Sequence, residues 1–91
     1  MLEFEWDERK AAANARKHGV KFREAASVFG DKLAVTFSNP DHSDSEDCFL
    51  TFGMSQENRL LVVSHTDRRN SVRIINAREM TRQERTVYEE T

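Results

Sequence analysis

Arginines alternate with apolar residues in the segment Arg73-Ile-Ile-Asn-Ala-Arg78. Further arginines flank this segment, at Arg68, Arg69, Arg82 and Arg85. A guanidinium group suits bidentate recognition of phosphate, because its planar fork matches two phosphate oxygens. The pattern therefore predicts an anion-binding surface, and the natural polyanion for it is a nucleic-acid backbone.

Charge is distributed unevenly along the chain, although the formal net charge is only -2. Residues 38 to 58 carry five Asp and Glu and no Lys or Arg, whereas residues 59 to 85 carry seven Arg against three Asp and Glu. A local field matters more to an anionic partner than the total charge does. The second stretch therefore favours anion binding. The alternative is that its charges cover a solvated sheet face and helix.

His42 and Glu46 form a second candidate group, within the acidic stretch. A histidine and a carboxylate can act as acid-base partners. The alternative is a solvated loop that happens to contain both. Their spacing, with Asp41 and Asp44 nearby, is a poor metal motif, because it lacks the Gly and the terminal Glu of a calcium loop. We expect no metal and no other cofactor.

The remaining histidines and the single cysteine are weaker candidates. We expect His18 at a helix end and His65 at a strand end. Cys48 excludes an internal disulfide and fits the cytosol. It has no neighbouring histidine or helix N-terminus in the sequence to activate its thiol, so we expect no nucleophilic role.

Length and composition indicate one domain over residues 1–91. A chain of this size buries roughly two-thirds of its unfolded surface in one modest core. No stretch approaches the ~18 apolar residues of a membrane helix. The acidic N-terminus does not resemble a secretory signal. We therefore expect a soluble, cytoplasmic domain without a membrane partner.

Hydrophobic periodicity predicts the elements that position these residues. A short edge strand at 4–6 precedes a helix at 8–18, N-capped by Asp7 and ended by Gly19. A second short helix runs from Phe22 to Gly30. Alternation predicts strands at 33–38, 47–53, 60–66 and 71–77, with a polar loop at 39–46. Thr81-Arg-Gln-Glu84 is a capping box that opens a last helix through Tyr88.

The predicted fold is an α+β domain with the order β-α-α-β-β-β-α. Consecutive strands with short turns must be antiparallel, so we expect a mostly antiparallel sheet with the helices packed on one face. Strict alternation places Asn76 with Val72 and Ile74 on one face, and Arg73 with Ile75 and Ala77 on the other.

Two outcomes are open for the main arginines. Arg73 and Arg78 could flank a groove that binds the anion. Alternatively, Arg73 pairs with an acidic residue on the next strand, and Arg78 caps the final helix.

In combination, the residues resemble the BrnT family, the ribonuclease half of bacterial type II toxin-antitoxin pairs. Each matching piece is weak alone, but together they span nearly the whole chain. The pieces are Phe4-Glu-Trp-Asp7, Lys10, Asn14, Lys17-His-Gly-Val20, Phe22, Glu24-Ala25, Val28-Phe29, Asp41-His-Ser43, Glu46, Gly53, Leu61-Val-Val63, Arg73-Ile-Ile75, Ala77-Arg78, Glu84-Arg85 and Tyr88.

The resemblance implies a compact RelE-like fold and metal-independent endonucleolytic cleavage of RNA. It also implies a hetero-oligomer with a cognate BrnA-type antitoxin, which neutralises the toxin and binds operator DNA. RNA cleavage without metal needs a base, an acid and cations around the phosphate.

We assign these roles as a hypothesis. Arg73 and Arg78 form the phosphate clamp, supported by Arg68, and Glu46 or His42 is the base. The acid is open among three residues, His42, His65 and Tyr88. Further RNA contacts are expected from Lys10, Arg69, Arg82 and Arg85.

One departure from the family pattern concerns Cys48. The family has Glu-x-Arg after the His-Ser loop, whereas this chain has Glu46-Asp47-Cys48. Asn76 also replaces a usual serine, a milder change. The missing arginine predicts weakened catalysis. The alternative function is a non-enzymatic module that holds antitoxin or RNA through the same arginines.

Overall fold

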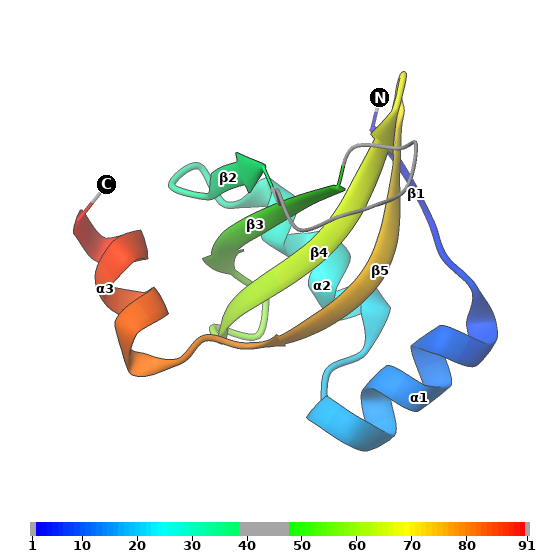
Figure 1. The fold of residues 1–91 in the computed structure, drawn as a ribbon, viewed down its shortest axis with the longest axis horizontal. Coiled ribbons are helices and arrows are strands. Elements are labelled where there is room, and N and C mark those ends of the chain that lie inside the picture. Colours follow the sequence, from blue (N-terminus) through cyan, green and yellow to red (C-terminus); the bar gives the residue numbers. More distant parts are fainter. Residues whose placement is uncertain (1, 39–47, 91) are drawn as a thin grey trace.

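The computed structural model describes residues 2–38 and 48–90, and Figure 1 shows their path. Four strands were predicted between the second helix and the last one, and all four form. The predicted order β-α-α-β-β-β-α has only three strands there, so it was one strand short. No helix in the described part of the chain is long and apolar enough to cross a membrane. The elements are β1 (Glu3–Glu5), α1 (Glu8–His18), α2 (Phe22–Ser27), the 3-10 turn η1 (Val28–Gly30), β2 (Val35–Ser38), β3 (Cys48–Met54), β4 (Leu60–Arg68), β5 (Ser71–Glu79) and α3 (Arg82–Glu90).

Local signals set the ends of the helices as predicted. The Asp7 carboxylate accepts hydrogen bonds from the amides of the second and third residues after it, at 2.7 and 3.2 Å. Gly19 ends α1 with a φ of 68°, a left-handed conformation that glycine adopts without strain. Thr81 and Glu84 bond each other's amides at 3.2 and 2.9 Å, which is the predicted capping box.

The sheet is mostly antiparallel, as predicted, and has the strand order β1-β5-β4-β3-β2. β1 is the predicted edge strand, but it runs parallel to β5, with Glu3 opposite Ser71 and Glu5 opposite Arg73. β5 lies between β1 and β4 although it comes last in the chain. The first and the last strand of the chain are therefore neighbours in the sheet.

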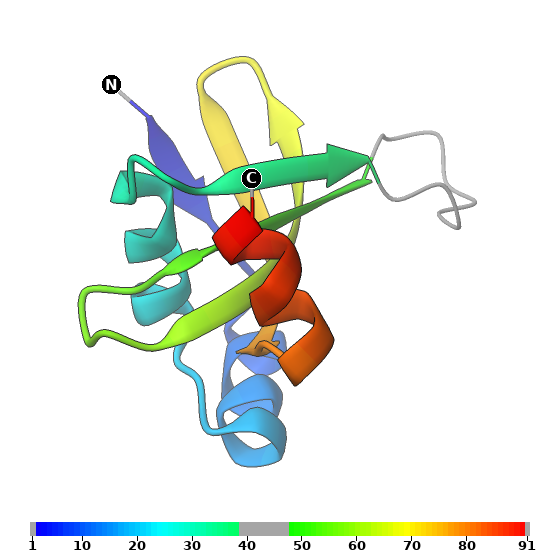
Figure 2. The same ribbon diagram turned by 90° about the vertical axis from the view of Figure 1, so that its left-hand side faces the viewer.

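The helices cover both faces of the sheet, so the prediction of one covered face was wrong (Figure 2). On the first face, α1 and α2 cover a core that includes Leu61 and Val63 of β4. On the second face, Tyr88 of α3 packs against a smaller cluster that includes Val62. β4 is apolar on both faces, and each apolar face needs a cover. We refer to the two sides as the α1/α2 face and the α3 face.

A β-bulge in β5 changes which side chains share a face. Ser64 pairs with Asn76, and His65 pairs with Ile74, so Ile75 is an extra residue on β5. An extra residue reverses the alternation beyond it. Residues 72, 74 and 77 therefore face α1 and α2, whereas residues 73, 76 and 78 face the α3 side. The strict alternation predicted from the sequence was wrong beyond residue 74.

Candidate functional site

One row of residues crosses the α3 face from strand to strand. Cys48 of β3 lies opposite Thr66 of β4, which lies opposite Arg73 of β5, which lies opposite Glu5 of β1. Neighbouring strands lie about 4.8 Å apart, so the backbones of Cys48 and Arg73 are roughly 10 Å apart. Side chains paired across strands share a face. We call these four residues the central row.

Arg73 makes a weak ion pair within the central row. Its Nη1 atom lies 3.6 Å from Oε1 of Glu5, and both side chains are more than a third exposed. The alternative in which Arg73 pairs with an acid on a neighbouring strand is therefore observed. Exposed pairs contribute ~0–1 kcal/mol, so an incoming phosphate could displace Glu5 at little cost.

Thr66 supplies an unused polar group in the middle of the same row. Its hydroxyl is buried and has no hydrogen-bond partner among the described residues. A buried unpaired hydroxyl costs about 1–3 kcal/mol, so a group left in this state needs an explanation. It lies between the backbone position of Cys48 and that of Arg73. A ligand held by Arg73 would give this hydroxyl a partner.

Arg78 is engaged by the final helix. Its Nη1 and Nη2 atoms donate to the two carboxylate oxygens of Glu84 at 2.7 and 2.8 Å. The hydrogen bonds from Arg78 lower the pKa of Glu84 to about 2, and the same pair raises the pKa of Arg78. The alternative in which Arg78 secures the last helix is therefore the one observed.

Arg73 and Arg78 are separated along β5. They lie five residues apart on β5, which corresponds to roughly 15 Å along a strand. Arg78 is held by Glu84, whereas Arg73 is paired weakly with Glu5. The sequence left open whether both arginines flank a groove or are held by structural partners.

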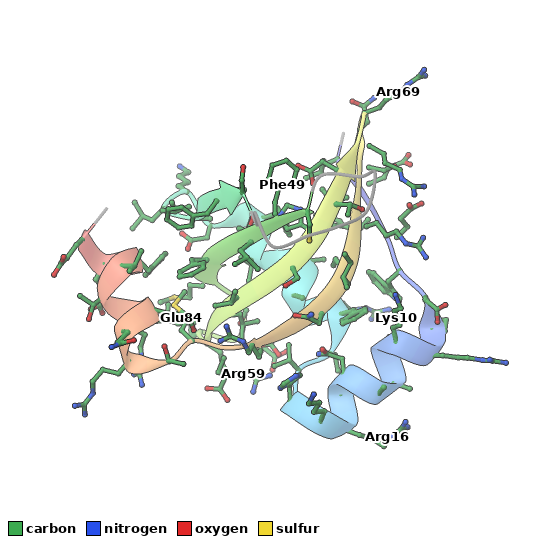
Figure 3. All side chains as sticks on the ribbon, in the orientation of Figure 1. Lys10, Arg16, Phe49, Arg59, Arg69 and Glu84 are labelled. Carbon is green, nitrogen blue, oxygen red and sulfur yellow. The ribbon has the colours of Figure 1, made fainter. Side chains whose placement is uncertain are left out.

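The other arginines are spread over the molecule rather than gathered at one point. Arg68 ends β4, and Arg69 forms the hairpin tip with a φ of 51°. Figure 3 shows Arg69 at that tip, far from the end of the sheet where Glu84 lies. Arg82 and Arg85 are exposed on α3. Across residues 2–38 and 48–90, no three His, Cys, Asp or Glu side chains converge to hold a metal ion.

His65 lies on the opposite face from Arg73. It stands within β4 and is 1% exposed, so the prediction of a strand-end position was wrong. Its ring contacts those of Phe29 and Phe49, and its two nitrogens bond Thr51 and Asp67 at 2.7 Å each. Burial lowers the pKa of His65 despite the neighbouring carboxylate of Asp67. The ring cannot protonate a group bound at the central row.

Tyr88 and Cys48 also have structural surroundings. The Tyr88 hydroxyl donates to Oδ2 of Asp31 at 2.6 Å, which raises the pKa of Tyr88 to about 12. This bond ties α3 to the segment after η1. Cys48 is a buried free thiol. Of the candidate acids, His42 is outside the described residues, as is the candidate base Glu46.

Asn14 is a buried polar residue for which the sequence suggested no role. Its amide group donates to the carbonyl of Ala77 at 2.8 Å and to that of Val20 at 3.0 Å, and it accepts from the Ala77 amide at 3.1 Å. β1 pairs with β5 only as far as Arg73. At Ala77, the side chain of Asn14 supplies the hydrogen bonds that a neighbouring strand would otherwise make. The available signal was an asparagine within the alanine-rich stretch of α1.

Comparison with known proteins decides the family. A family model described as "Ribonuclease toxin, BrnT, of type II toxin-antitoxin system" matches residues 6–84. The chain belongs to the BrnT family. The match confirms the resemblance seen in the sequence. BrnT proteins are ribonuclease toxins of type II toxin-antitoxin systems, and such a system implies an antitoxin protein as partner.

A solved BrnT structure has the same fold. The chain is similar to the crystal structure of the Brucella abortus ribonuclease toxin BrnT, with a TM-score of 0.67 at 18% identity. The alignment covers 90% of this chain and 100% of that one. At this identity the likeness supports the fold alone. No curated protein sequence matches the chain.

Proposed function

We propose that this BrnT-family chain is a metal-independent endoribonuclease toxin that cleaves RNA at the central row and arrests growth. A cognate BrnA-type antitoxin neutralises it in a hetero-oligomer and links it to operator DNA. The observation that carries the proposal is the position of Arg73. Its guanidinium shares one face with the unpaired hydroxyl of Thr66 and with residue 48.

The proposed reaction is attack by the ribose 2′-oxygen on the neighbouring phosphorus. A base takes the 2′ proton, the O2′–P bond forms and the P–O5′ bond breaks, and an acid protonates the leaving 5′-oxygen. The products are a 2′,3′-cyclic phosphate and a 5′-hydroxyl. Arg73 stabilises the charge that builds on the phosphorane oxygens, because a fixed guanidinium needs little reorganisation during the reaction.

We assign the base to Glu46 and the acid to His42. The support is by elimination among the candidates. His65 is buried on the other face, and the hydroxyl of Tyr88 is bonded to Asp31. Glu46 precedes Cys48 by two residues in the chain, and Cys48 opens the central row. The other RNA contacts we propose come from Arg68, Arg69, Arg82 and Arg85.

A second function has specific support. The chain could be a catalytically weakened module that holds antitoxin or RNA without cutting it. Cys48 occupies the row position where the family places an arginine, and Glu84 occupies both terminal nitrogens of Arg78. Under this reading, the arginines contribute binding energy but little transition-state stabilisation.

The variant Arg73→Gln separates the two functions, with Arg16→Gln as the matched control. Arg16 is exposed on α1 and lies away from the central row. An enzyme predicts a loss of RNA cleavage of about 10²–10³-fold and of growth arrest in Arg73→Gln, with antitoxin binding retained. A binding module predicts that antitoxin or RNA affinity falls instead. The measurements are growth and RNA integrity on inducible expression, with and without the antitoxin. Intact RNA and normal growth with wild-type protein would reject the enzyme.

A further inference from the structure

A shallow pocket of about 220 Å³ lies where α1 meets the open edge of β5. Its lining contains two lysines, a histidine and two carboxamides, and no carboxylate. The residues are Lys10, Ala13, Asn14, Lys17, His18, Ile75 and Asn76. Among these residues, only Lys10 was assigned an RNA contact from the sequence.

The backbone explains why the edge is open at this point. β1 pairs with β5 through Arg73, and Asn14 takes the backbone groups of Ala77. The bulged residue Ile75 lies between the part of β5 that pairs with β1 and the part that Asn14 contacts. Ala13 leaves room above it, since its side chain is a single methyl group. The pocket is therefore a consequence of the bulge and of the short length of β1.

The helix contributes its charge to the pocket by position. Lys10 and Lys17 lie two turns apart on one side of α1, about 10 Å along its axis. Both lysines are exposed and flank the buried side of α1, where Asn14 lies. Neither lysine forms an ion pair with a carboxylate in the described part of the chain. Figure 3 shows Lys10 on the sheet side of α1 and Arg16 away from it.

The pocket borders the α3 face at one residue. Asn76 lines the pocket and, through its pairing with Ser64, also belongs to the α3 face that carries Arg73. Asp7 is the carboxylate close to both Lys10 and Arg73. It is already occupied as the cap of α1, by the hydrogen bonds from the amides of Lys10 and Arg9. Cationic side chains therefore lie on both sides of Asp7, with Arg73 on β5, paired with Glu5, and with Lys10 and Lys17 on α1.

We propose that this pocket binds a backbone phosphate of the RNA strand, next to the phosphate that Arg73 contacts. The proposal rests on the proposed function and extends it to the path of the substrate. Lys10 and Lys17 supply charge, and His18 and Asn76 supply hydrogen-bond donors at the two sides of the phosphate. A strand that crosses the α3 face at Arg73 passes Asn76 and then reaches the lysines.

The test is the salt dependence of RNA affinity. Binding of a single-stranded oligonucleotide with 2′-O-methyl riboses, which cannot be cut by this reaction, is measured over a range of salt concentrations. The double variant Lys10→Gln/Lys17→Gln should reduce the slope of log affinity against log salt by about 0.7, the value for one lost phosphate contact. Its affinity should fall roughly tenfold. Glutamine is a good helix former, so α1 should persist.

The matched control is Arg9→Gln/Arg16→Gln, which removes the same charge from the same helix outside the pocket. It should leave the slope unchanged. Equal loss in both double variants would show diffuse attraction and would overturn the proposal, as would no loss in either.

A second arm uses inorganic phosphate and follows the side-chain amide resonance of Asn76. Phosphate should shift this resonance in the wild type and not in Lys10→Gln/Lys17→Gln, and the oligonucleotide should compete with it. A shift without competition would show a small-anion site and overturn the proposal for RNA. Failure of the wild type to bind RNA at all would overturn the proposed function as well. Retained cleavage with an unchanged slope would overturn this inference alone.

Discussion

Position 48 shows how one side chain could limit catalysis. Cys48 ends the central row, roughly 10 Å from Arg73 across two strands. A long cationic side chain at this position would extend over the same face and reach the phosphate that Arg73 holds. The cross-strand row therefore gives a geometric reason for the arginine that the resemblance led us to expect at this position, which the sequence alone did not supply.

We expect Cys48→Arg to raise the rate of RNA cleavage by about 10²–10³-fold, the usual effect of one well-placed electrostatic donor. The measurement is single-turnover cleavage of RNA by the purified variant. Cys48→Gln is the control, since it adds length without charge. Because Cys48 is buried, the urea midpoint of both variants is measured too. No gain of the arginine variant over the glutamine variant would contradict a catalytic role for this position.

His65 makes the stability of the fold sensitive to mild acid. Burial lowers the pKa of His65 below its ordinary value of 6.5. As the pH falls below 6.5, the unfolded chain binds a proton that the folded chain resists, so the free energy of unfolding decreases. Above 6.5 this contribution is constant.

We therefore expect the urea midpoint of the wild type to fall between pH 7 and pH 5. His65→Gln, which keeps a polar group near Thr51, should show a smaller fall over the same interval. The measurement is urea unfolding at several pH values in constant salt. An identical pH dependence in the two proteins would contradict the assignment.

At the scale of elements, buried polar contacts join segments that are distant in the sequence. Glu24 of α2 accepts from Ser55 at 2.7 Å and from the guanidinium of Arg59, which also donates to the carbonyl of Gly19. These bonds tie α2 and the end of α1 to the β3–β4 hairpin. On the other face, none of the described residues of α3 is buried. Contacts at its two ends, through Glu84 and Tyr88, hold it in place.

Gly53 lets η1 approach β3 closely. A Cβ atom at this position would lie 2.7 Å from Cγ1 of Val28 and 3.1 Å from Cβ of Ala34. We expect Gly53→Ala to reduce the free energy of unfolding by about 1–3 kcal/mol, because an extra methyl group overpacks a filled core.

Gly30→Ala is the matched control, since a Cβ atom there meets nothing within 4 Å and its φ is not left-handed. It should be neutral or slightly stabilising, because alanine restricts the unfolded chain. Denaturant unfolding of both variants gives the comparison. Equal effects at the two glycines would show that close packing at β3 is not the cause.

At the scale of the molecule, the two faces of the sheet have different tasks. The α1/α2 face carries the main core and the buried His65 network. The α3 face carries the smaller cluster at one end and the central row at the other. The cationic pocket lies at the edge where the two faces meet. A stable core on one side therefore leaves the other side available for a polar surface.

Much of this architecture follows from patterns short enough to be read along the chain. The caps at Asp7 and Gly19, the capping box at Thr81, the helix over residues 8–18 and the alternating strands depend on neighbours within a few residues. The family pattern likewise spans the sequence. These features were predicted because local sterics and hydrogen bonding determine them.

The positions of the functional groups depend on contacts between distant residues. The bulge at Ile75 arises from pairing with β4, and it moves Asn76 and Arg78 to the face of Arg73. Cys48 and Arg73 meet in one row because two antiparallel registers align them.

The sequence alone determined the helices, the strands, the family and the arginine-rich segment, since local periodicity and residue type encode them. Only the tertiary structure showed which residues share a face with Arg73. Strand register and the packing of each helix depend on contacts between residues that are distant in the sequence. These contacts form when both faces of β4 are buried. They place Thr66 and Cys48 in one row with Arg73, and they bring Lys10 and Lys17 beside the open edge of β5.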